Sequence, residues 1–297
     1  MVAMASSGAS ARRSLPALDH LWQGDVVPLD VDRLAEVDAV FLALPEEASA
    51  AVAPVLVERG VRVFDLSGAF RLRDDAARAR WYPGTAAVLP DTAYGLTEHA
   101  RQAIRHARLI ACPGCYPTPA ILALKPLVSA GLISGDIVID AKSGVSGAGK
   151  ASSERTHFSE VHGSISAYKV FAHRHAAEIE QELGVGVTFV PHLVPLDRGI
   201  FETIYVRVVA GTTTDAITAS YGAAYTGACF VRLKGPALPV IKQVAWTNFC
   251  DIGWLLDEAS NRLVIVSVID NLLKGAAGQA LQNFNVAYGF DERSGLV

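Results

Sequence analysis

Two buried strands with a helix between them constrain the fold of this chain more than any other feature. Apolar runs of strand length occur at residues 37–45, VDAVFLALP, and at residues 61–68, VRVFDLSG. The segment between them, EEASAAVAPVLVERG, has helical character and ends at Gly60, a residue that commonly terminates helices. A strand, a helix and a second buried strand form a β-α-β unit, which builds parallel sheets. The pattern predicts an α/β protein.

Further along the chain the order of elements changes. A helical stretch, TEHARQAIRHA, and a third strand, RLIACPG, precede the helical segment YPTPAILALKPLVSAG. Strands DIVIDAKSG, VTFVPHLVPL and GIFETIYVRVV then mix with helices HRHAAEIEQELG and TTDAITASYGAAYTG and with a hairpin, WLLDEASNRLVIVSVID. We expect a parallel-sheet domain of residues 1–114, joined by the C-terminal helix 271–297, and an α+β domain with a mixed sheet, residues 115–270. The small residues GAAG in the last helix suggest close packing against the first domain.

Charge and composition exclude several classes of protein. Acidic residues outnumber basic ones by 30 to 26, and no Lys/Arg cluster is longer than a pair, which argues against nucleic-acid binding. No apolar stretch approaches the length of a membrane span, and no Cys/His spacing completes a metal site. Four cysteines are too few for a disulfide scaffold and fit a reducing cytosol. The first residues resemble an organelle transit peptide in composition only, so we expect a cytoplasmic protein with a small-molecule partner.

The segment ACPGCYPT contains the strongest candidate for chemistry. Cys115 lies between a buried strand and the start of a helix, where the helix dipole and free amides favour the nucleophilic thiolate. Two other interpretations stay open, because buried cysteines are common and because Cys112 and Cys115 form a C-x-x-C pair typical of redox dithiols. Cys229 and Cys250 stand alone on strand-like segments and are expected in the core.

Three further segments offer polar groups. The HRH sequence at His173 and His175 opens a helix and supplies candidate proton-transfer groups, although surface histidines are common. Arg198 lies in a tight loop between two strands, a natural position for a carboxylate or phosphate clamp, although a solvated charge in a turn is equally common. The loop from Gly144 to Lys150 matches G-x-x-x-x-G-K, but alanine follows the lysine where a P-loop needs Ser or Thr. What remains is a small-residue loop whose amides can bind an anion. No G-x-G-x-x-G occurs after any strand.

Five motifs in register resemble one enzyme family. The motifs are ACPGCYPT, SGVSGAGK, VFAHRHAAEI, PLDRGIFET and DNLLKGAAGQALQN, supported by FDLSGAFRLRD, WYPG and AYGLTE. In order and wording they resemble the N-acetyl-gamma-glutamyl-phosphate reductases of arginine biosynthesis. The resemblance implies a Rossmann-type cofactor domain joined to an α+β catalytic and dimerisation domain. It also implies an NADP-dependent oxidoreductase, a semialdehyde dehydrogenase that forms homodimers or homotetramers.

The resemblance also assigns roles to residues. It makes Cys115 the nucleophile that forms a thioester with the substrate acyl group, and His173 the acid/base group. The residues implied for binding the acyl-phosphate substrate are Ser143, Gly144, Lys150, His175 and Arg198, and those implied for the cofactor are Ser67, Gly147 and Asn271.

The chain departs from the family at its start. Family members begin with a strand and a Gly-rich turn, G-A-S-G-Y-x-G, and this chain starts after that unit, so the cofactor domain is expected to be shortened and to expose a sheet edge. Two alternatives follow. One is a sister acyl-phosphate reductase of lysine biosynthesis, and the other is a regulatory or hetero-oligomeric subunit that binds no cofactor.

Overall fold

A computed structural model describes residues 4–6, 15, 18–85, 88–149 and 153–297. The chain divides into two compact units. The first comprises Met1–Ala93 and His106–Ala111, and the second comprises Tyr94–Arg105 and Cys112–Val297. The domain limits expected from the sequence, 1–114 with 271–297 and 115–270, remain a prediction.

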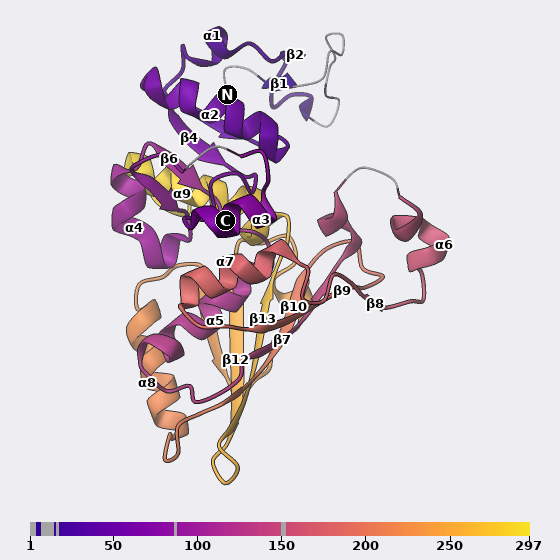
Figure 1. The fold of residues 1–297 in the computed structure, drawn as a ribbon, viewed down its shortest axis with the longest axis vertical. Helices are drawn as coiled ribbons and strands as arrows, with labels where there is room; N and C mark the ends of the chain where they lie inside the picture. The colour runs from indigo at the N-terminus through magenta and orange to yellow at the C-terminus, as the bar shows by residue number, and fades with distance from the viewer. Residues whose placement is uncertain (1–3, 7–14, 16–17, 86–87, 150–152) are drawn as a thin grey trace. The chain divides into compact units, whose positions relative to one another are not determined.

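The first unit is built on a sheet with the strand order β3-β4-β6-β5 (Figure 1). β3 (Ala39–Leu42) pairs in parallel with β4 (Arg62–Asp65), and β4 pairs in parallel with β6 (Leu109–Ala111). β5 (Thr92–Tyr94) lies beside β6. Helix α2 (Glu46–Glu58) connects β3 to β4. The β-α-β unit expected from the sequence is confirmed, with shorter strands than the apolar runs, because Pro45 ends the extended segment and begins the helix.

Smaller elements complete this unit. The strands β1 (Met4–Ser6) and β2 (Val26–Pro28) pair in parallel, and α1 (Val31–Leu34) and α3 (Asp75–Trp81) are short helices. The core lies between α2 and the sheet. Its fully buried members are Ala53, Leu56, Val63, Ala69 and Ala111.

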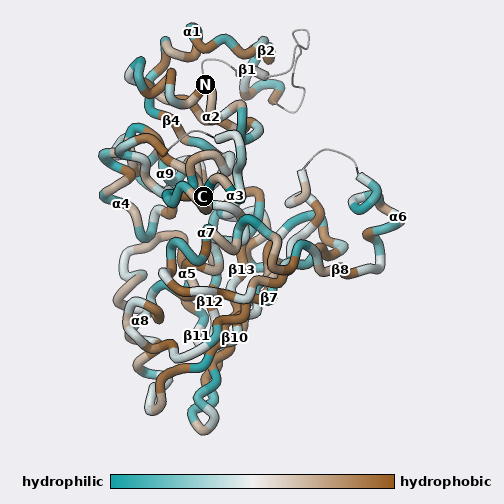
Figure 2. The backbone as a smooth tube through the Cα atoms, in the orientation of Figure 1, coloured by the Kyte–Doolittle hydropathy of each residue, from teal (hydrophilic) through white to brown (hydrophobic). Residues whose placement is uncertain are grey.

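The second unit contains a mixed sheet of order β11-β12-β13-β10-β7-β9-β8. The strands are β7 (Val138–Ser143), β8 (Ser166–Ala167), β9 (Thr188–Leu193), β10 (Ile200–Arg207), β11 (Val231–Gly235), β12 (Cys250–Asp257) and β13 (Arg262–Ile269). β7 and β9 are parallel, as are β11 and β12, and the other pairs are antiparallel. The mixed sheet expected from the sequence is therefore confirmed. β7 and β10 mix hydrophobic and hydrophilic residues along their length (Figure 2), and their buried positions alternate.

Helices α5 (Pro117–Ser129), α7 (Arg174–Leu183) and α8 (Thr214–Tyr225) cover one face of this sheet (Figure 1). α5 is apolar on all sides, and most of its side chains are buried because it packs between β10, β13 and the other two helices. The remaining elements are α4 (Thr97–His106), α6 (Phe158–Val161), α9 (Gly278–Tyr288) and the 3-10 turns η2 (Val145–Ala148), η3 (Glu154–Thr156) and η4 (Ile241–Gln243).

The C-terminal segment differs from the single helix that the sequence suggests. It starts with a π-helical turn, η5 (Leu273–Ala277), before α9 begins. The small residues permit close packing, as expected, but the approaches that the structure records lie within the second unit, between Gly275 and Cys115 and between Gly278 and Asn248. Among the described residues, no helix is long and apolar enough to cross a membrane.

Candidate active site

Cys115 occupies the turn between β6 and α5. Its side chain is partly buried and packs against the hydrophobic core of the second unit. α5 begins at Pro117, which has no N–H to satisfy and a fixed φ suited to the first helical position. The next amide, that of Thr118, donates to Gly114 O at 3.2 Å. This turn puts the thiol at the positive end of the helix dipole, where a thiolate is favoured.

A buried carboxylate holds the turn from a distant part of the chain. Glu178 lies on α7 and is fully buried. Its Oε1 accepts hydrogen bonds from Gly114 N at 2.6 Å and from the Tyr94 hydroxyl at 2.7 Å. Because Glu178 lies on α7, the helix capped by His173, its hydrogen bond to Gly114 links that helix directly to the cysteine turn.

The π-helical turn packs against the other side of Cys115. A Cβ added to Gly275 would lie 3.0 Å from the Cys115 Cβ and 3.2 Å from Ile269 Cδ1. No residue larger than glycine fits there without a shift of its neighbours. π-turns occur often at functional sites, and this one lies directly against the candidate nucleophile.

His173 is the N-cap residue of α7. Its Nδ1 accepts a hydrogen bond from His175 N at 3.2 Å, so in the neutral ring Nε2 carries the proton. Burial, followed by the charges of Lys169 and Arg174, lowers the pKa of His173 to about 4. The buried ring of His175 lies 4.7 Å from that of His173, centroid to centroid. The neutral imidazole is therefore the form present at physiological pH.

Two tyrosines connect the histidines to the cysteine turn. The ring of Tyr116 lies 5.8 Å from the His173 ring, and the ring of Tyr168 lies 5.6 Å from it on another side. The two hydroxyls are 3.2 Å apart. Burial raises the pKa of both phenols, and the nearby Cys115 contributes to each shift. Cys115, His173 and the two phenols thus belong to one cluster.

The loop after β7 is docked on a second loop. Gly144 N donates to Gly199 O at 2.9 Å, and a Cβ on Gly144 would lie 2.8 Å from Arg198 backbone atoms. Asn271 joins both loops, because its Oδ1 accepts from Gly199 N at 2.6 Å and its Nδ2 donates to Ser146 Oγ at 3.0 Å. Ser143, at the end of β7, is buried, and its Oγ donates to Gly144 O.

Gly147 belongs to the same loop and is exposed. A Cβ there would lie 2.7 Å from Ser143 Oγ. Ser143, Gly144, Gly147, Arg198 and Asn271 are therefore brought together, whereas Lys150 lies outside the described residues.

Arg198 is held between an acid and an aromatic ring. Its NH1 donates to Asp270 Oδ2 at 3.0 Å, and its guanidinium carbon lies 3.6 Å from the centre of the Trp246 ring. Asp270 is fully buried and also accepts from the backbone amides of Trp246, Leu272 and Leu273, at 2.7, 2.9 and 3.1 Å. Three backbone donors thus share the charge of Asp270, and the guanidinium keeps capacity for a further anion.

Ser67 lies in the first unit, in the turn after β4. Its N and Oγ donate to the two carboxylate oxygens of Asp65 at 3.2 and 2.7 Å, and its Oγ accepts from Ala69 N at 3.1 Å. Burial raises the pKa of Asp65. The turn follows the carboxyl end of a parallel strand, the edge at which α/β sheets bind nucleotides. In that respect the described residues fit a nicotinamide nucleotide.

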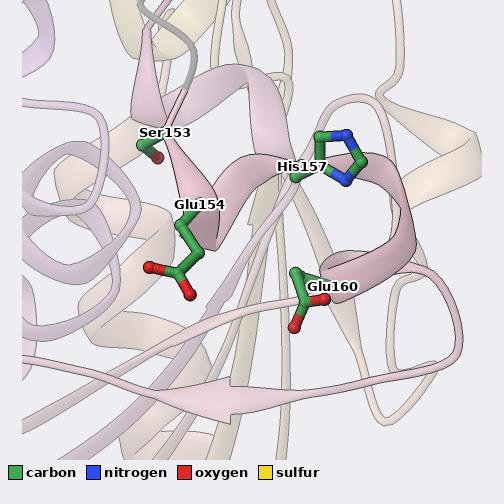
Figure 3. A pocket seen from close by; sticks show the side chains of 4 residues that line it. All are labelled: Ser153, Glu154, His157 and Glu160. Carbon is green, nitrogen blue, oxygen red and sulfur yellow. The ribbon is translucent and has the colours of Figure 1, made fainter.

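A pocket elsewhere on the second unit does not suit an anionic substrate. It has a volume of about 420 Å³ and is lined by Ser153, Glu154, His157 and Glu160 (Figure 3). Its two carboxylates would repel a phosphate group. Within the described part of the chain, no group of three His, Cys, Asp or Glu side chains is arranged to hold a metal ion.

Several residues of the cluster escaped the sequence analysis, chiefly Glu178, Tyr116 and Trp246. Glu178 had a signal, since it is a charged residue three positions after His175 and beside Ile179 on the helix face that becomes buried. Cys112 is buried, and its Sγ accepts a hydrogen bond from Asn283 Nδ2 at 3.7 Å.

Comparison with known families matches both parts of the chain. Residues 1–107 match the NAD-binding domain of semialdehyde dehydrogenases, and residues 115–271 match their dimerisation domain. A crystal structure of aspartate semialdehyde dehydrogenase II from Vibrio cholerae shares the fold, with a TM-score of 0.69 at 19% identity over 94% of this chain and 87% of that one.

Curated relatives are closer in sequence. A protein of Geobacillus thermodenitrificans named N-acetyl-gamma-glutamyl-phosphate reductase is 50% identical over 90% of this chain and 81% of its own length. One of the same name from Shouchella clausii is 44% identical over 98% of this chain and 88% of its own.

Proposed function

The chain belongs to the N-acetyl-gamma-glutamyl-phosphate reductase family, and from that premise we propose that it reduces N-acetyl-gamma-glutamyl phosphate to N-acetyl-glutamate semialdehyde with release of phosphate, in arginine biosynthesis. The observation that carries the proposal is the Cys115 turn, which Glu178 fixes to the helix that begins at His173. A thiol at a helix start beside a neutral imidazole suits acyl transfer to sulfur.

Cys115 is the proposed nucleophile. Its thiolate attacks the acyl carbonyl, the C–O bond to phosphate breaks, and a thioester remains. The Tyr116 amide, at the start of α5, is the candidate donor for the developing oxyanion, because Pro117 has no N–H and the Thr118 amide is already used within the turn. A bound nicotinamide cofactor would supply the hydride that reduces this thioester, and Cys115 would leave as the thiolate when the aldehyde is released.

His173 is the proposed acid/base residue. Its Nδ1 accepts from the His175 amide, so Nε2 carries the proton of the neutral ring and can act as a hydrogen-bond donor. The reaction consumes one proton, because the departing phosphate is more basic than the acyl phosphate it came from. The Nε2–H of His173 is positioned to donate that proton or to stabilise the oxyanion.

The cofactor is proposed to be NADPH, which supplies the hydride when bound. Ser67, Gly147 and Asn271 are the proposed cofactor contacts. Ser143, Gly144, Lys150, His175 and Arg198 are the proposed substrate contacts, and Arg198 is the cation best suited to the substrate carboxylate.

We further propose a homodimer or homotetramer that works in the cytoplasm. The outer face of the second unit's sheet supports an oligomer, because Tyr205, Val264 and Leu255 form a row across β10, β13 and β12. Tyr205 and Leu255 are 45% and 50% exposed. An exposed apolar row on a sheet face is typical of a protein interface.

The test is turnover of the purified chain with N-acetyl-gamma-glutamyl phosphate and NADPH, followed by NADPH absorbance. We expect Cys115→Ser to lose about a thousandfold or more in kcat, and Cys112→Ser, the matched control, to keep kcat within a few fold. Mass spectrometry of the chain mixed with acyl phosphate alone is expected to find the acyl group on Cys115.

Three outcomes contradict the proposal: a wild-type chain that does not oxidise NADPH, a fully active Cys115→Ser variant, or equal losses in the two cysteine variants, which would favour a dithiol. A preference for the aminoadipyl phosphate would instead favour the lysine-branch reductase. The named relatives do not favour that alternative, nor the cofactor-free subunit.

A further inference from the structure

Trp246 is an exposed aromatic residue in a strained backbone conformation. Its φ is +66°, a region that bulky residues rarely adopt, and its surface is 69% exposed. The segment around it is fixed by hydrogen bonds from Trp246 N to Asp270 Oδ2, at 2.7 Å, and from Thr247 N to Val244 O, at 3.0 Å. Neither burial nor turn chemistry accounts for a tryptophan here, and strain of this kind clusters at binding sites.

The strained turn lies next to the candidate active site. The side chain of Asp270 accepts the hydrogen bond from the Trp246 amide. Its backbone oxygen accepts a second hydrogen bond, from Gly275 N at 3.0 Å. Gly275 in turn packs against Cys115. Three successive contacts, by way of Asp270 and Gly275, therefore link the Trp246 backbone to the candidate nucleophile.

Trp246 also presents one ring face to Arg198. The guanidinium carbon lies 3.6 Å from the ring centre, and the Arg198 side chain is only 15% exposed. Among the described residues, Asp270 is the single hydrogen-bond partner of that guanidinium, through NH1. The remaining N–H groups lie in the guanidinium plane, and the guanidinium carbon is only 3.6 Å from the ring centre, so an anion bound at the free edge lies near the indole.

The chemical groups of the substrate indicate what the indole ring of Trp246 would contact. Apart from the reacting acyl phosphate, an N-acyl-glutamyl phosphate carries a carboxylate and a planar N-acyl amide on the same carbon. If Arg198 takes the carboxylate, the amide and its methyl group lie within reach of the indole, which extends beyond the smaller guanidinium. A flat amide with a methyl group is a good partner for an aromatic face.

We propose that Trp246 is a specificity-determining, substrate-binding residue, whose indole contacts the N-acyl group while Arg198 binds the neighbouring carboxylate. The inference rests on the proposed function and deepens it. Trp246 distinguishes N-acylated substrates by the size of the acyl group.

The experiment measures kcat and KM with the N-formyl, N-acetyl and N-propionyl forms of gamma-glutamyl phosphate. The variant Trp246→Gly suits the positive φ, so its backbone is expected to hold. We expect KM for the N-acetyl substrate to rise about tenfold and KM for the N-formyl substrate about threefold or less, with kcat changed less than about twofold. Trp246→Phe keeps an aromatic face and is expected to stay within about threefold of wild type.

Asn261→Gly is the matched control. Asn261 also has a positive φ, of +54°, but lies in the turn between β12 and β13. It is expected to leave KM unchanged for all three substrates.

The proposal is overturned if Trp246→Gly raises KM equally for the formyl and acetyl substrates, because Trp246 would then only support Arg198. It is also overturned if no KM changes, or if the losses follow a change in oligomeric mass, measured by light scattering, which would make Trp246 an interface residue. A wild-type chain that turns over none of the three substrates refutes the proposed function itself, a distinct result.

Discussion

The Ser67 turn of the first unit and the Cys115 turn of the second are held by contacts of very different sequence range. Ser67 is fixed by Asp65 and Ala69, each two positions away. The Cys115 turn is held by Glu178, 64 positions from Gly114, and is packed by Gly275. The first turn can form from a short piece of chain, whereas the second needs most of its unit folded.

This difference has a consequence for mutations. A change far from the Ser67 turn should reach it only through global stability. A change at Glu178 or Gly275 should alter the geometry at Cys115 directly, and reacting groups misplaced by about 1 Å cost about a hundredfold in rate. Mutations that disturb the Cys115 turn should therefore lower activity directly as well as stability, whereas distant mutations should affect the Ser67 turn only through stability.

The largest effect is expected from Glu178→Ala. It removes the acceptor of the Gly114 amide and of the Tyr94 hydroxyl, and each buried donor left unsatisfied costs about 1–3 kcal/mol. We expect the free energy of unfolding to fall by about 3–5 kcal/mol and kcat to fall about a hundredfold. Urea denaturation and steady-state kinetics measure the two.

Glu178→Gln is the conservative companion, because its amide oxygen can take the place of Oε1 and accept both hydrogen bonds, although without the negative charge that strengthens them. It should recover about half of the lost stability. A Glu178→Ala variant that kept the wild-type kcat in its folded fraction would contradict the claim that Glu178 holds the Cys115 turn in its reactive geometry.

Gly275→Ala is expected to have the next largest effect. Its Cβ would lie 3.0 Å from the Cys115 Cβ, so either the π-turn or the cysteine must shift. We expect a loss of about 1–3 kcal/mol in the free energy of unfolding and about a tenfold loss in kcat.

Gly222→Ala is the matched control. Gly222 lies inside α8, and a Cβ there would meet nothing within 4 Å. It should stabilise the protein by about 0.5–1 kcal/mol without changing kcat. Equal kinetic effects of the two alanines would show that the tight contact at Cys115 has no functional meaning.

The same contrast explains what could be predicted from the sequence. The β-α-β unit, the β12–β13 hairpin and the N-terminal position of Cys115 on α5 follow from apolar runs, turn residues and proline, all of them local signals. Arg198 and Asn271 were selected as candidates through motifs, but their contacts with Asp270 and Ser146 were not predicted, because these contacts form only in the folded sheet. The π-turn had no local signal at all, since the sequence from Leu273 suits an ordinary α-helix.

His173 lies in the second unit but, unlike the Cys115 turn, is held by a local contact, the hydrogen bond from His175 N. Its pKa of about 4 lies below the usual 6.5, so the unfolded chain binds a proton more readily than the folded one. The stability this provides is fully present above pH 6.5 and is lost as the pH falls through about 4. NMR of labelled histidine should place its midpoint near 4, with His173→Gln assigning the signal.

Comparing unfolding at neutral and acidic pH checks the sign. The wild type should lose more stability than His173→Gln on acidification. A titration near 6.5 would mean that the ring is not held neutral by its surroundings.

The smallest effect is expected from Ser67→Ala, which removes the side-chain contacts to Asp65 and Ala69 but keeps the backbone hydrogen bond from residue 67 to Asp65. If Ser67 contacts the cofactor, KM for NADPH should rise about threefold with kcat unchanged, the effect of one modest hydrogen bond. Thr85→Ala is the control, since Thr85 makes a similar local hydrogen bond to Tyr82 O in the same unit. If both variants raised KM alike, the effect would come from the stability of the unit. If only Ser67→Ala did so, the short-range turn would be a cofactor contact whose loss leaves the Cys115 chemistry intact.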